Sequence, residues 1–371
     1  MRFNIQPVTR FIVAALVLFT LATVFLRLNI YRVLLALDAT AKSAGDGAKT
    51  TKPAGTAFSD IVIPYLTLVT PGLSVLYPWV VATSVFVETN VVAFAVSFAT
   101  LLFGGKYCER VWSSRELAVF LGLTGVIPVV LTFFSLILLF AIRVSSGDGG
   151  NAGAVHVVNG TVGLQLAFLV AFKQLVPEHS IVLFRGLFTI KVKHLVMPVL
   201  ILYTLLGAFR GVEIALLAWY GFFTAWVYLR FYRVTYVDPL LPTTTPVATG
   251  EAGDAANSAA DSSKTRIRGD ASEVFALNTF FYPGVVREAV HALSRLVFKT
   301  LVVFRVCTPF GQEEVEQGNI RASLRTNGPR AAAAVAAGSK SAADADAERR
   351  RAYALKVLEE RLDTRKNDTT A

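Results

Sequence analysis

Long apolar runs separated by short polar segments make up the first 231 residues of the chain. A helix that crosses a bilayer needs about 20 predominantly apolar residues. The first run is short, but the Arg27 side chain can reach the interface and the apolar pattern resumes through Tyr31. A cleaved signal peptide is the alternative for this run, but no small-residue cleavage site follows Leu26, which favours a retained helix. The pattern therefore predicts six membrane helices, over residues 11–26, 85–105, 118–142, 155–176, 195–209 and 214–231.

The segment between the first two runs has a different character. Residues 38–57 are polar and predict a loop. Residues 61–79 are apolar but contain helix breakers, and a proline in a lipid-exposed helix leaves backbone groups without hydrogen bonds. We expect this second segment to be re-entrant or interfacial. The breakers are Pro64, Pro71, Gly72 and Pro78.

The apolar pattern stops after residue 233, where the membrane domain (1–233) is expected to end. Residues 234–271 are rich in Pro, Thr, Ala, Gly, Asp and Ser and predict a flexible linker, because they cannot bury enough apolar surface to fold. Residues 272–371 form a tail that we expect to be largely disordered. The sequence thus predicts an all-α polytopic membrane protein, a six-helix bundle followed by a polar C-terminal tail.

Two helical patterns interrupt this tail. Residues 285–305 carry an apolar stripe beside a basic one, which is typical of an amphipathic helix on a membrane surface or of a helix packed on the protein's own spans. Residues 347–363 place Leu355, Leu358 and Leu362 on one face. So short a helix needs a partner to be stable and is otherwise half-formed in solvent.

Composition and charge exclude several classes of protein. The chain is 54% hydrophobic and 17% charged with a mean hydropathy of +0.55, which is not the composition of a water-soluble enzyme. Two cysteines are too few for a disulfide scaffold or a thiolate metal cluster. Of the net charge of +10, residues 1–232 carry +8, so the basic excess lies in the apolar half. Short basic flanks of membrane spans produce this distribution, so we expect lipids rather than nucleic acid as partners.

The Lys and Arg residues of the short loops also predict the orientation. Six spans put both termini on one side of the membrane. The loops on that side carry eleven Lys and Arg residues, and the opposite loops carry seven. Because basic residues are enriched in cytoplasmic loops, both termini are predicted to be cytosolic.

Ionisable residues are scarce within the predicted spans. Glu88 and Glu213 fall at predicted lumenal ends, while Lys173 and Glu178 fall near the cytosolic end of the fourth span. A buried ionisable residue is the usual sign of a proton relay or ion site in a membrane protein. The sequence therefore argues against a coupled transporter, although a site lined by backbone carbonyls stays open. We expect no cofactor and no metal, and a homo-oligomer is left open.

Four landmarks resemble the rhomboid fold. They are Tyr77-Pro78-Trp79 before the second span, Gly105-x-x-x-Glu109 at its end, Gly160-x-x-Gly163 at the start of the fourth span and Gly221-x-x-x-Ala225 in the sixth. Small residues at this spacing also occur wherever membrane helices pack closely.

The resemblance implies a loss of proteolytic activity. The position of the rhomboid nucleophile holds Val162, and that of its catalytic histidine holds Ala218. The two positions that help to hold the oxyanion contain Ala93 and Ser97. Acyl transfer needs a hydroxyl activated by a base, so we predict a pseudoprotease with no catalytic residue. Thr161 offers a hydroxyl, but no histidine is predicted inside the membrane to activate it.

Longer blocks are similar to the transmembrane protein 115 family, a rhomboid-like group of Golgi membrane proteins. They span residues 77–79 with 88–90, 104–117, 168–179 and 228–232, with a further element at 354–356 and 359–362, and they include Glu88, Asn90, Glu109, Arg110, Lys173, Gln174, Pro177, Glu178 and His179. The residues from Lys173 to His179 suggest either a docking face or a plain helix end, and Glu109 and Arg110 suggest either a functional pair or an anchor.

This resemblance implies a non-catalytic adaptor or scaffold in the Golgi membrane. It further implies a role in retrograde transport from Golgi to endoplasmic reticulum and association with the conserved oligomeric Golgi tethering complex. The alternative is a rhomboid-like pseudoprotease that binds client membrane proteins in quality control.

Overall fold

The computed structural model describes residues 6–43, 61–70, 77–146, 156–183, 188–237, 265–281 and 310–327, together with scattered positions between 287 and 302. The chain divides into two compact units. Unit 1 comprises residues 1–232 and 275–309, and unit 2 comprises residues 233–274 and 310–371. The helix expected over 347–363 and the middle of the expected linker lie outside the described residues.

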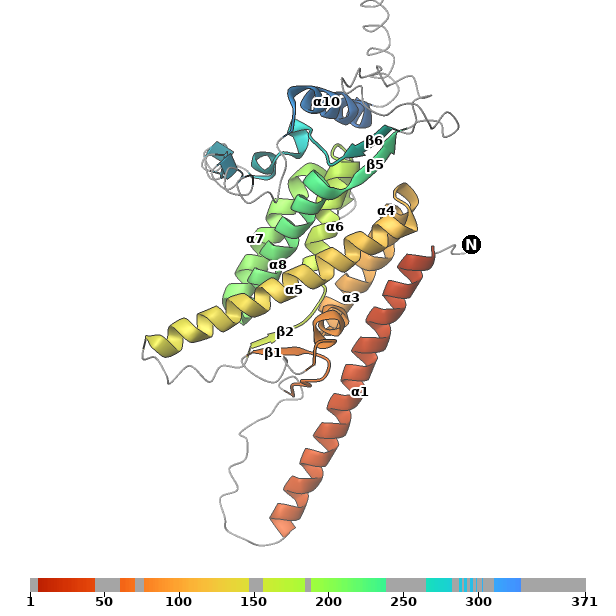
Figure 1. Cartoon of the computed structure of the whole chain (residues 1–371). Coiled ribbons are helices and arrows are strands. Elements are labelled where there is room, and N and C mark those ends of the chain that lie inside the picture. The colour runs from red at the N-terminus through yellow and green to blue at the C-terminus, as the bar shows by residue number, and fades with distance from the viewer. Residues whose placement is uncertain are drawn as a thin grey trace, which may run out of the picture. The chain divides into compact units, whose positions relative to one another are not determined.

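Unit 1 is a bundle of apolar helices (Figure 1). Among the described residues, five helices are long and apolar enough to cross a membrane, and α6 (Val162–Leu175) is a shorter sixth. The all-α membrane fold expected from the sequence is confirmed. The five are α1 (Pro7–Ser43), the continuous helix formed by α3 (Val91–Ala99), η4 (Thr100–Gly104) and α4 (Gly105–Val111), then α5 (Ser114–Ser145), α7 (Val192–Arg210), and α8 (Val212–Val227) continued by η6 (Tyr228–Tyr232).

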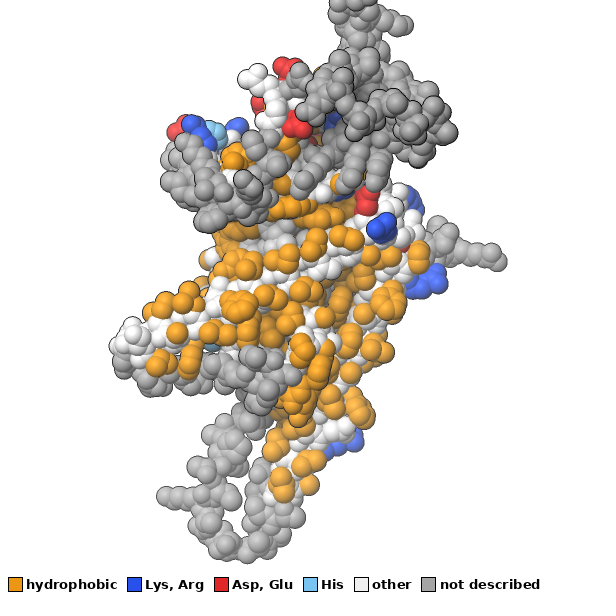
Figure 2. Space-filling view, in the orientation of Figure 1, with side chains coloured by type: hydrophobic (Ala, Val, Ile, Leu, Met, Phe, Trp, Pro, Cys, Tyr) orange, Lys and Arg blue, Asp and Glu red, His pale blue; other side chains and the backbone are white. Residues whose placement is uncertain are grey.

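The outer surface of these helices is apolar. Figure 2 shows hydrophobic side chains covering much of the visible face of the helices, with basic side chains near helix ends. Helix α1 illustrates the pattern, because Phe11, Leu18 and Leu21 are all more than 60% exposed. An apolar surface of this extent on a folded chain is the surface that a bilayer covers.

Helix α6 is shorter than the sequence suggested. The apolar run 155–176 predicts one span, but its first part forms β2 (His156–Val158), which pairs antiparallel with β1 (Leu68–Thr70). The helix itself is buried on nearly all faces by its neighbours. Its 14 residues extend about 21 Å, less than a bilayer core of about 30 Å. An enclosed helix does not need the full length of the lipid.

Glycines set the spacing between α6 and α8. A Cβ atom added to Gly221 would lie 2.5 Å from the Cα atom of Gly163. The two backbones therefore touch, as small residues permit between membrane helices. Gly207 has the same role between α7 and α8, where an added Cβ would lie 2.6 Å from that of Ala215.

The chain directions define two ends of the bundle. The Glu88 end holds the starts of α3, α6 and α8, with the pair β1–β2, the short helix α2 (Val80–Thr83) and η3 (Ser84–Phe86). The Glu109 end holds the starts of α1, α5 and α7. It also holds the hairpin of β3 (Ser180–Leu183) and β4 (Phe188–Lys191), which joins α6 to α7.

Unit 1 also contains a segment that follows the linker in sequence. The end of η7 (Glu273–Phe275) and η8 (Leu277–Phe280) belong to the bundle's core through Phe275, Phe280 and Phe281. The described positions from 287 to 302 are helical. Of these, Val290 packs against the core and Phe298 stacks on Phe231 with 6.2 Å between ring centroids.

Unit 2 contains three described elements. Strands β5 (Val234–Val237) and β6 (Thr265–Arg268) pair antiparallel across the two ends of the expected linker. Helix α10 (Gln312–Asn327) lies against residues 271–273, where Asn319 Oδ1 accepts a hydrogen bond from the Glu273 N–H at 2.8 Å. The sequence analysis assigned no element to the residues of α10.

Candidate functional site

A cluster of buried polar side chains joins α3, α6 and α7 near the Glu88 end. The Thr161 hydroxyl donates to Ser97 Oγ at 2.6 Å, and the Thr161 N–H donates to Glu88 Oε1 at 2.9 Å. Ser97 Oγ donates to the same carboxylate oxygen at 2.7 Å. Gln165 Nε2 donates to Ser97 Oγ at 3.0 Å, and Gln165 Oε1 accepts from the Tyr203 hydroxyl.

This cluster places Glu88 differently from the sequence analysis, which expected a carboxylate at the interface. Glu88 is only 8% exposed. Burial of a carboxylate is tolerated because the Thr161 N–H and the Ser97 hydroxyl donate to it, in place of the lost water. Gly160 permits the approach: its φ of +102° favours glycine, and an added Cβ would meet Glu88 Oε2 at 3.2 Å.

The geometry of the cluster does not favour nucleophilic chemistry. Ser97 and Thr161 are completely buried, so a substrate has no access to either hydroxyl. His156 lies closest to them in sequence, but its Nδ1 atom is 3.1 Å from Glu213 Oε2. A hydroxyl becomes a nucleophile when a base within hydrogen-bond reach activates it and a substrate can approach. Through these hydrogen bonds the cluster connects three helices.

The positions that the resemblance to rhomboids predicts to have lost their catalytic side chains lie on packed helices. Val162 is the first residue of α6, directly before Gly163, and Ala218 is completely buried on α8, three residues before Gly221. Ala93 lies half-buried on α3, and Ser97 belongs to the polar cluster. Apolar side chains thus occupy the region of α6 and α8 where the nucleophile and base would be expected.

At the other end, Glu109 caps helix α1. Its carboxylate accepts hydrogen bonds from the N–H groups of Val8 and Thr9 at 3.0 and 2.9 Å and from the Thr9 hydroxyl at 2.7 Å. The Ser114 hydroxyl donates to it at 2.8 Å. The first N–H groups of a helix lack partners within the helix and attract negative charge. Glu109 therefore fixes the start of α1 to α4, and Gly105 leaves room for Thr9, which lies 3.0 Å from an added Cβ.

Lys173 is a buried cation on α6. Its side chain is 3% exposed, and its ammonium lies 3.3 Å from the centroid of the Phe280 ring and donates to Thr279 Oγ1 at 3.0 Å. The ring and the hydroxyl replace water around the charge. Gln174 beside it is also buried.

Aromatic contacts hold the same tail segment. Phe222 on α8 packs against Phe280 and Phe281, with ring centroids 5.4 and 6.4 Å apart. The Trp226 indole N–H donates to the Phe275 carbonyl at 3.1 Å. We call residues 275–281 the docked segment.

The turn that follows α6 is tied to the start of α7. Glu178 accepts hydrogen bonds from the ammonium groups of Lys191 and Lys193 at 2.8 and 2.7 Å, which hold the pKa of Glu178 below its usual 4.5. The Lys193 N–H donates to the Pro177 carbonyl, and the Val192 N–H donates to the carbonyl of His179. These contacts make the corner a fixed structure rather than a loose helix end.

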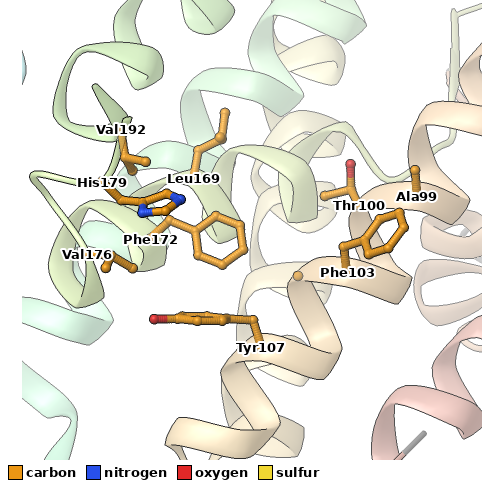
Figure 3. Close-up of a pocket in the computed structure, with 10 residues that line it drawn as sticks. Ala99, Thr100, Phe103, Tyr107, Leu169, Phe172, Val176, His179 and Val192 are labelled. Carbon is orange, nitrogen blue, oxygen red and sulfur yellow. The ribbon is translucent and has the colours of Figure 1, made fainter. Parts of the chain in front are cut away.

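An apolar cleft of about 490 Å³ opens between α3–η4–α4 and α6 near this corner (Figure 3). His179 and Tyr107 are the polar-tipped aromatic side chains in its lining. The Tyr107 ring meets that of Phe172 across the cleft with 5.6 Å between centroids. The remaining lining is Ala99, Thr100, Phe103, Gly104, Leu169, Val176 and Val192.

The positions singled out in the sequence thus fall into two separate groups. Tyr77, Trp79 and Asn90 lie towards the Glu88 end, where the Tyr77 ring contacts those of Tyr65 and Trp79 at 5.1 Å. Asn90 precedes α3, and its carbonyl accepts from the Phe94 N–H. Pro78 lies between Tyr77 and Trp79 and belongs to this first group. The other group lies at the Glu109 end, where Arg110 is exposed on α4.

Several residues that form these contacts were not predicted from the sequence. Gln165 and Tyr203 complete the polar cluster, and Thr9 completes the α1 cap. For Phe280 a signal existed, because residues 275–281 contain three phenylalanines directly after a polar linker. Aromatic residues at this density are unusual in a disordered tail.

Comparisons with known proteins identify relatives over most of the chain. Residues 10–364 match the family described as eukaryotic integral membrane protein (DUF1751). Transmembrane protein 115 of Mus musculus is 30% identical over 317 residues, which cover 79% of this chain and 71% of the relative. The transmembrane protein 115 homolog of Saccharomyces cerevisiae is 26% identical over 298 residues, 77% of each chain. Rhomboid-like protein 19 of Arabidopsis thaliana is 27% identical over 310 residues, 83% of each chain. No solved structure matches the chain.

Proposed function

The chain belongs to the family of eukaryotic integral membrane proteins that includes transmembrane protein 115, and from this premise we propose that it is a non-catalytic scaffold of the Golgi membrane. In this role it acts in retrograde transport from the Golgi to the endoplasmic reticulum. Its tail recruits the conserved oligomeric Golgi tethering complex.

The residues at the expected catalytic positions support a non-catalytic role. Val162 and Ala218 stand where a rhomboid protease has its nucleophile and base, and neither side chain can transfer a proton. The hydroxyls of Thr161 and Ser97 are buried and hydrogen-bonded to each other. A scaffold needs a rigid body, and the polar cluster and the Gly163–Gly221 contact provide rigidity.

The observation that carries the proposal is the docked segment. Residues 275–281 return to the bundle after the linker and bind Lys173, Phe222 and Trp226. The tail is therefore anchored to the membrane domain instead of diffusing on a tether of full length. Anchoring raises the effective concentration of anything that the rest of the tail binds near the membrane.

The same contact supports a common side for the two termini. Thr9 at the start of α1 bonds to Glu109, and the docked segment bonds to Lys173 at the same end of the bundle. With the excess of Lys and Arg in the loops of that side, we place both termini in the cytosol.

Proximity labelling from the C-terminus in cells tests the location and the partner together. We expect Golgi proteins and subunits of the tethering complex to be labelled. A chain ending at residue 327 retains the docked segment and α10, so it should keep its location but lose the labelling of the tether. Equal labelling of the tether by the shortened chain would place the binding surface elsewhere.

Two further measurements test the transport role and the lack of activity. In cells without their own copy, this chain should restore the return of a Golgi-to-endoplasmic-reticulum reporter, and normal return without it would contradict the transport role. The purified chain should leave model transmembrane substrates intact. Cleavage that disappears in Thr161→Ala would show an enzyme instead.

A further inference from the structure

The cleft at the Glu109 end has an apolar interior and a polar rim. Its walls are formed by membrane helices, and Phe103 at its edge is 70% exposed, so the cleft opens towards lipid. Ligand pockets of about 300–1,000 Å³ commonly combine such an apolar lining with a few polar groups that orient the ligand. The volume of about 490 Å³ falls in this range.

Besides Thr100, whose hydroxyl donates to the Val96 carbonyl within its own helix, two polar aromatic side chains line this cleft. The Tyr107 side chain is 39% exposed, and no partner for its hydroxyl lies among the described residues. The His179 ring lies on the facing wall, and Figure 3 shows it beside Phe172. Both groups can donate a hydrogen bond to an acceptor at the rim.

An exposed cation follows Tyr107 on the same helix. Arg110 lies one turn beyond Tyr107 on α4, so the two side chains share a face of the helix. Arg110 is exposed, and within the part of the chain that the structure describes its guanidinium bonds to no carboxylate. On the facing wall, Lys191 and Lys193 share the single carboxylate of Glu178, which leaves that corner with a net positive charge.

From this arrangement we propose that the cleft binds an anionic phospholipid. One acyl chain occupies the apolar cleft, the phosphate accepts hydrogen bonds from Tyr107 and His179, and a second anionic group of the headgroup, such as the carboxylate of phosphatidylserine, accepts from Arg110. Arginine suits this role because its planar guanidinium donates to carboxylate oxygens in pairs.

The position of the cleft and the charge beside it favour a phospholipid as the occupant. The cleft lies at the end of helices that cross the bilayer, where acyl chains and phosphates of the same molecule meet apolar and basic side chains together. A helix of another protein would fill the apolar part but leave the basic rim without a counter-charge. The site does not depend on the proposed role in transport.

Photoactivatable lipids test the site on the full chain in nanodiscs. Phosphatidylserine or phosphatidylcholine with a diazirine on one acyl chain is cross-linked, and the labelled peptides are mapped. Both lipids carry the phosphate, and phosphatidylserine adds a headgroup carboxylate. We therefore expect phosphatidylserine to label the residues that line the cleft about tenfold more than phosphatidylcholine, because its carboxylate provides one further charge-assisted hydrogen bond with Arg110. Labelling around Phe134, an exposed residue of α5, serves as the reference for ordinary lipid contact.

Variants separate the headgroup from the acyl chain. Arg110→Gln should abolish the preference for phosphatidylserine and keep the cleft labelled, whereas Ala99→Phe should fill the cleft and reduce labelling by both lipids. Arg143→Gln, at the other end of the bundle on α5, is the matched control and should change neither.

Equal labelling of the cleft by both lipids in the unaltered chain would overturn the proposal, because it would show ordinary boundary lipid. Cross-links from the cleft to a second protein would overturn it in favour of a helix as the occupant. If a variant fails to fold, competition on the unaltered chain replaces it: unlabelled phosphatidylserine should displace the probe, and equal displacement by phosphatidylcholine would refute the site.

Discussion

Phe280→Ala is expected to release the docked segment from the membrane domain. Phe280 is 1% exposed and packs on Phe222 and Phe275, with the Lys173 ammonium over its ring. Its removal leaves a cavity in the apolar contact and removes one of the two groups that surround the buried cation. Both effects weaken docking, and neither changes the spans themselves.

The size of the effect follows from burial. Truncation of a buried Phe to Ala costs about 3–5 kcal/mol. Since about 1.4 kcal/mol corresponds to a factor of ten, the ratio of docked to undocked segment should fall roughly a hundredfold or more. A cycle with Lys173→Met should show coupling of about 1–2 kcal/mol between the two side chains, as expected for a desolvated cation–π contact.

Hydrogen exchange of residues 275–281 in the purified full chain measures the docking. The amides of the segment should exchange faster by about the same factor in Phe280→Ala, while those of α6 outside the Lys173 turn stay protected. Phe209→Ala removes a ring that is 86% exposed on α7 and should leave the segment protected. Unchanged exchange in Phe280→Ala would refute the inference that this ring anchors the tail.

Three other predictions concern helix contacts. Glu109→Ala should destabilise the bundle by about 2 kcal/mol or more, because it leaves the N–H groups of Val8 and Thr9 without an acceptor; thermal unfolding beside Glu288→Ala, an exposed control, checks this. Gly221→Ala should destabilise the protein strongly, since its Cβ would lie 2.5 Å from Gly163, whereas Gly122→Ala meets nothing within 4 Å and should be neutral in the same unfolding assay. Glu178 is stabilising above its unfolded pKa of about 4.5 and loses this contribution as the pH falls through its lower folded value. Protection factors of the 176–180 turn, which are corrected for the intrinsic pH dependence of amide exchange, should therefore fall below pH 4.5 and stay constant there in Glu178→Gln.

The apolar runs were sufficient to predict the membrane fold. A long apolar run has few stable arrangements other than a spanning helix, so the five spans followed from the apolar character of the runs and of their flanks, although some runs were shorter than about 20 residues. The run 155–176 shows the limit of this reasoning. Hydropathy does not distinguish a lipid-facing helix from an enclosed one, and it did not separate β2 from the helix α6.

Side-chain roles were harder to predict because they depend on contacts distant in sequence. Glu88 was expected at an interface, but its donors include Thr161, 73 residues away. Glu109 suggested a helix anchor, and its partners on α1 are about 100 residues away. Lys173 suggested a docking face or a plain helix end, and the structure buries it under Phe280. The sequence pattern around each of these residues gives no information about such distant partners.

The burial of Lys173 makes the membrane domain and the tail depend on each other. A buried ammonium is costly unless other groups replace its water, and within the described residues the groups that do so are Thr279 and Phe280, both from the docked segment. A bundle without this segment would therefore lose these contacts to Lys173 and uncover the ring of Phe222. Any partner that displaces the segment must supply an aromatic face or an acceptor in its place. An apolar peptide without either should compete poorly, and one that carries a carboxylate beside a phenylalanine should compete best.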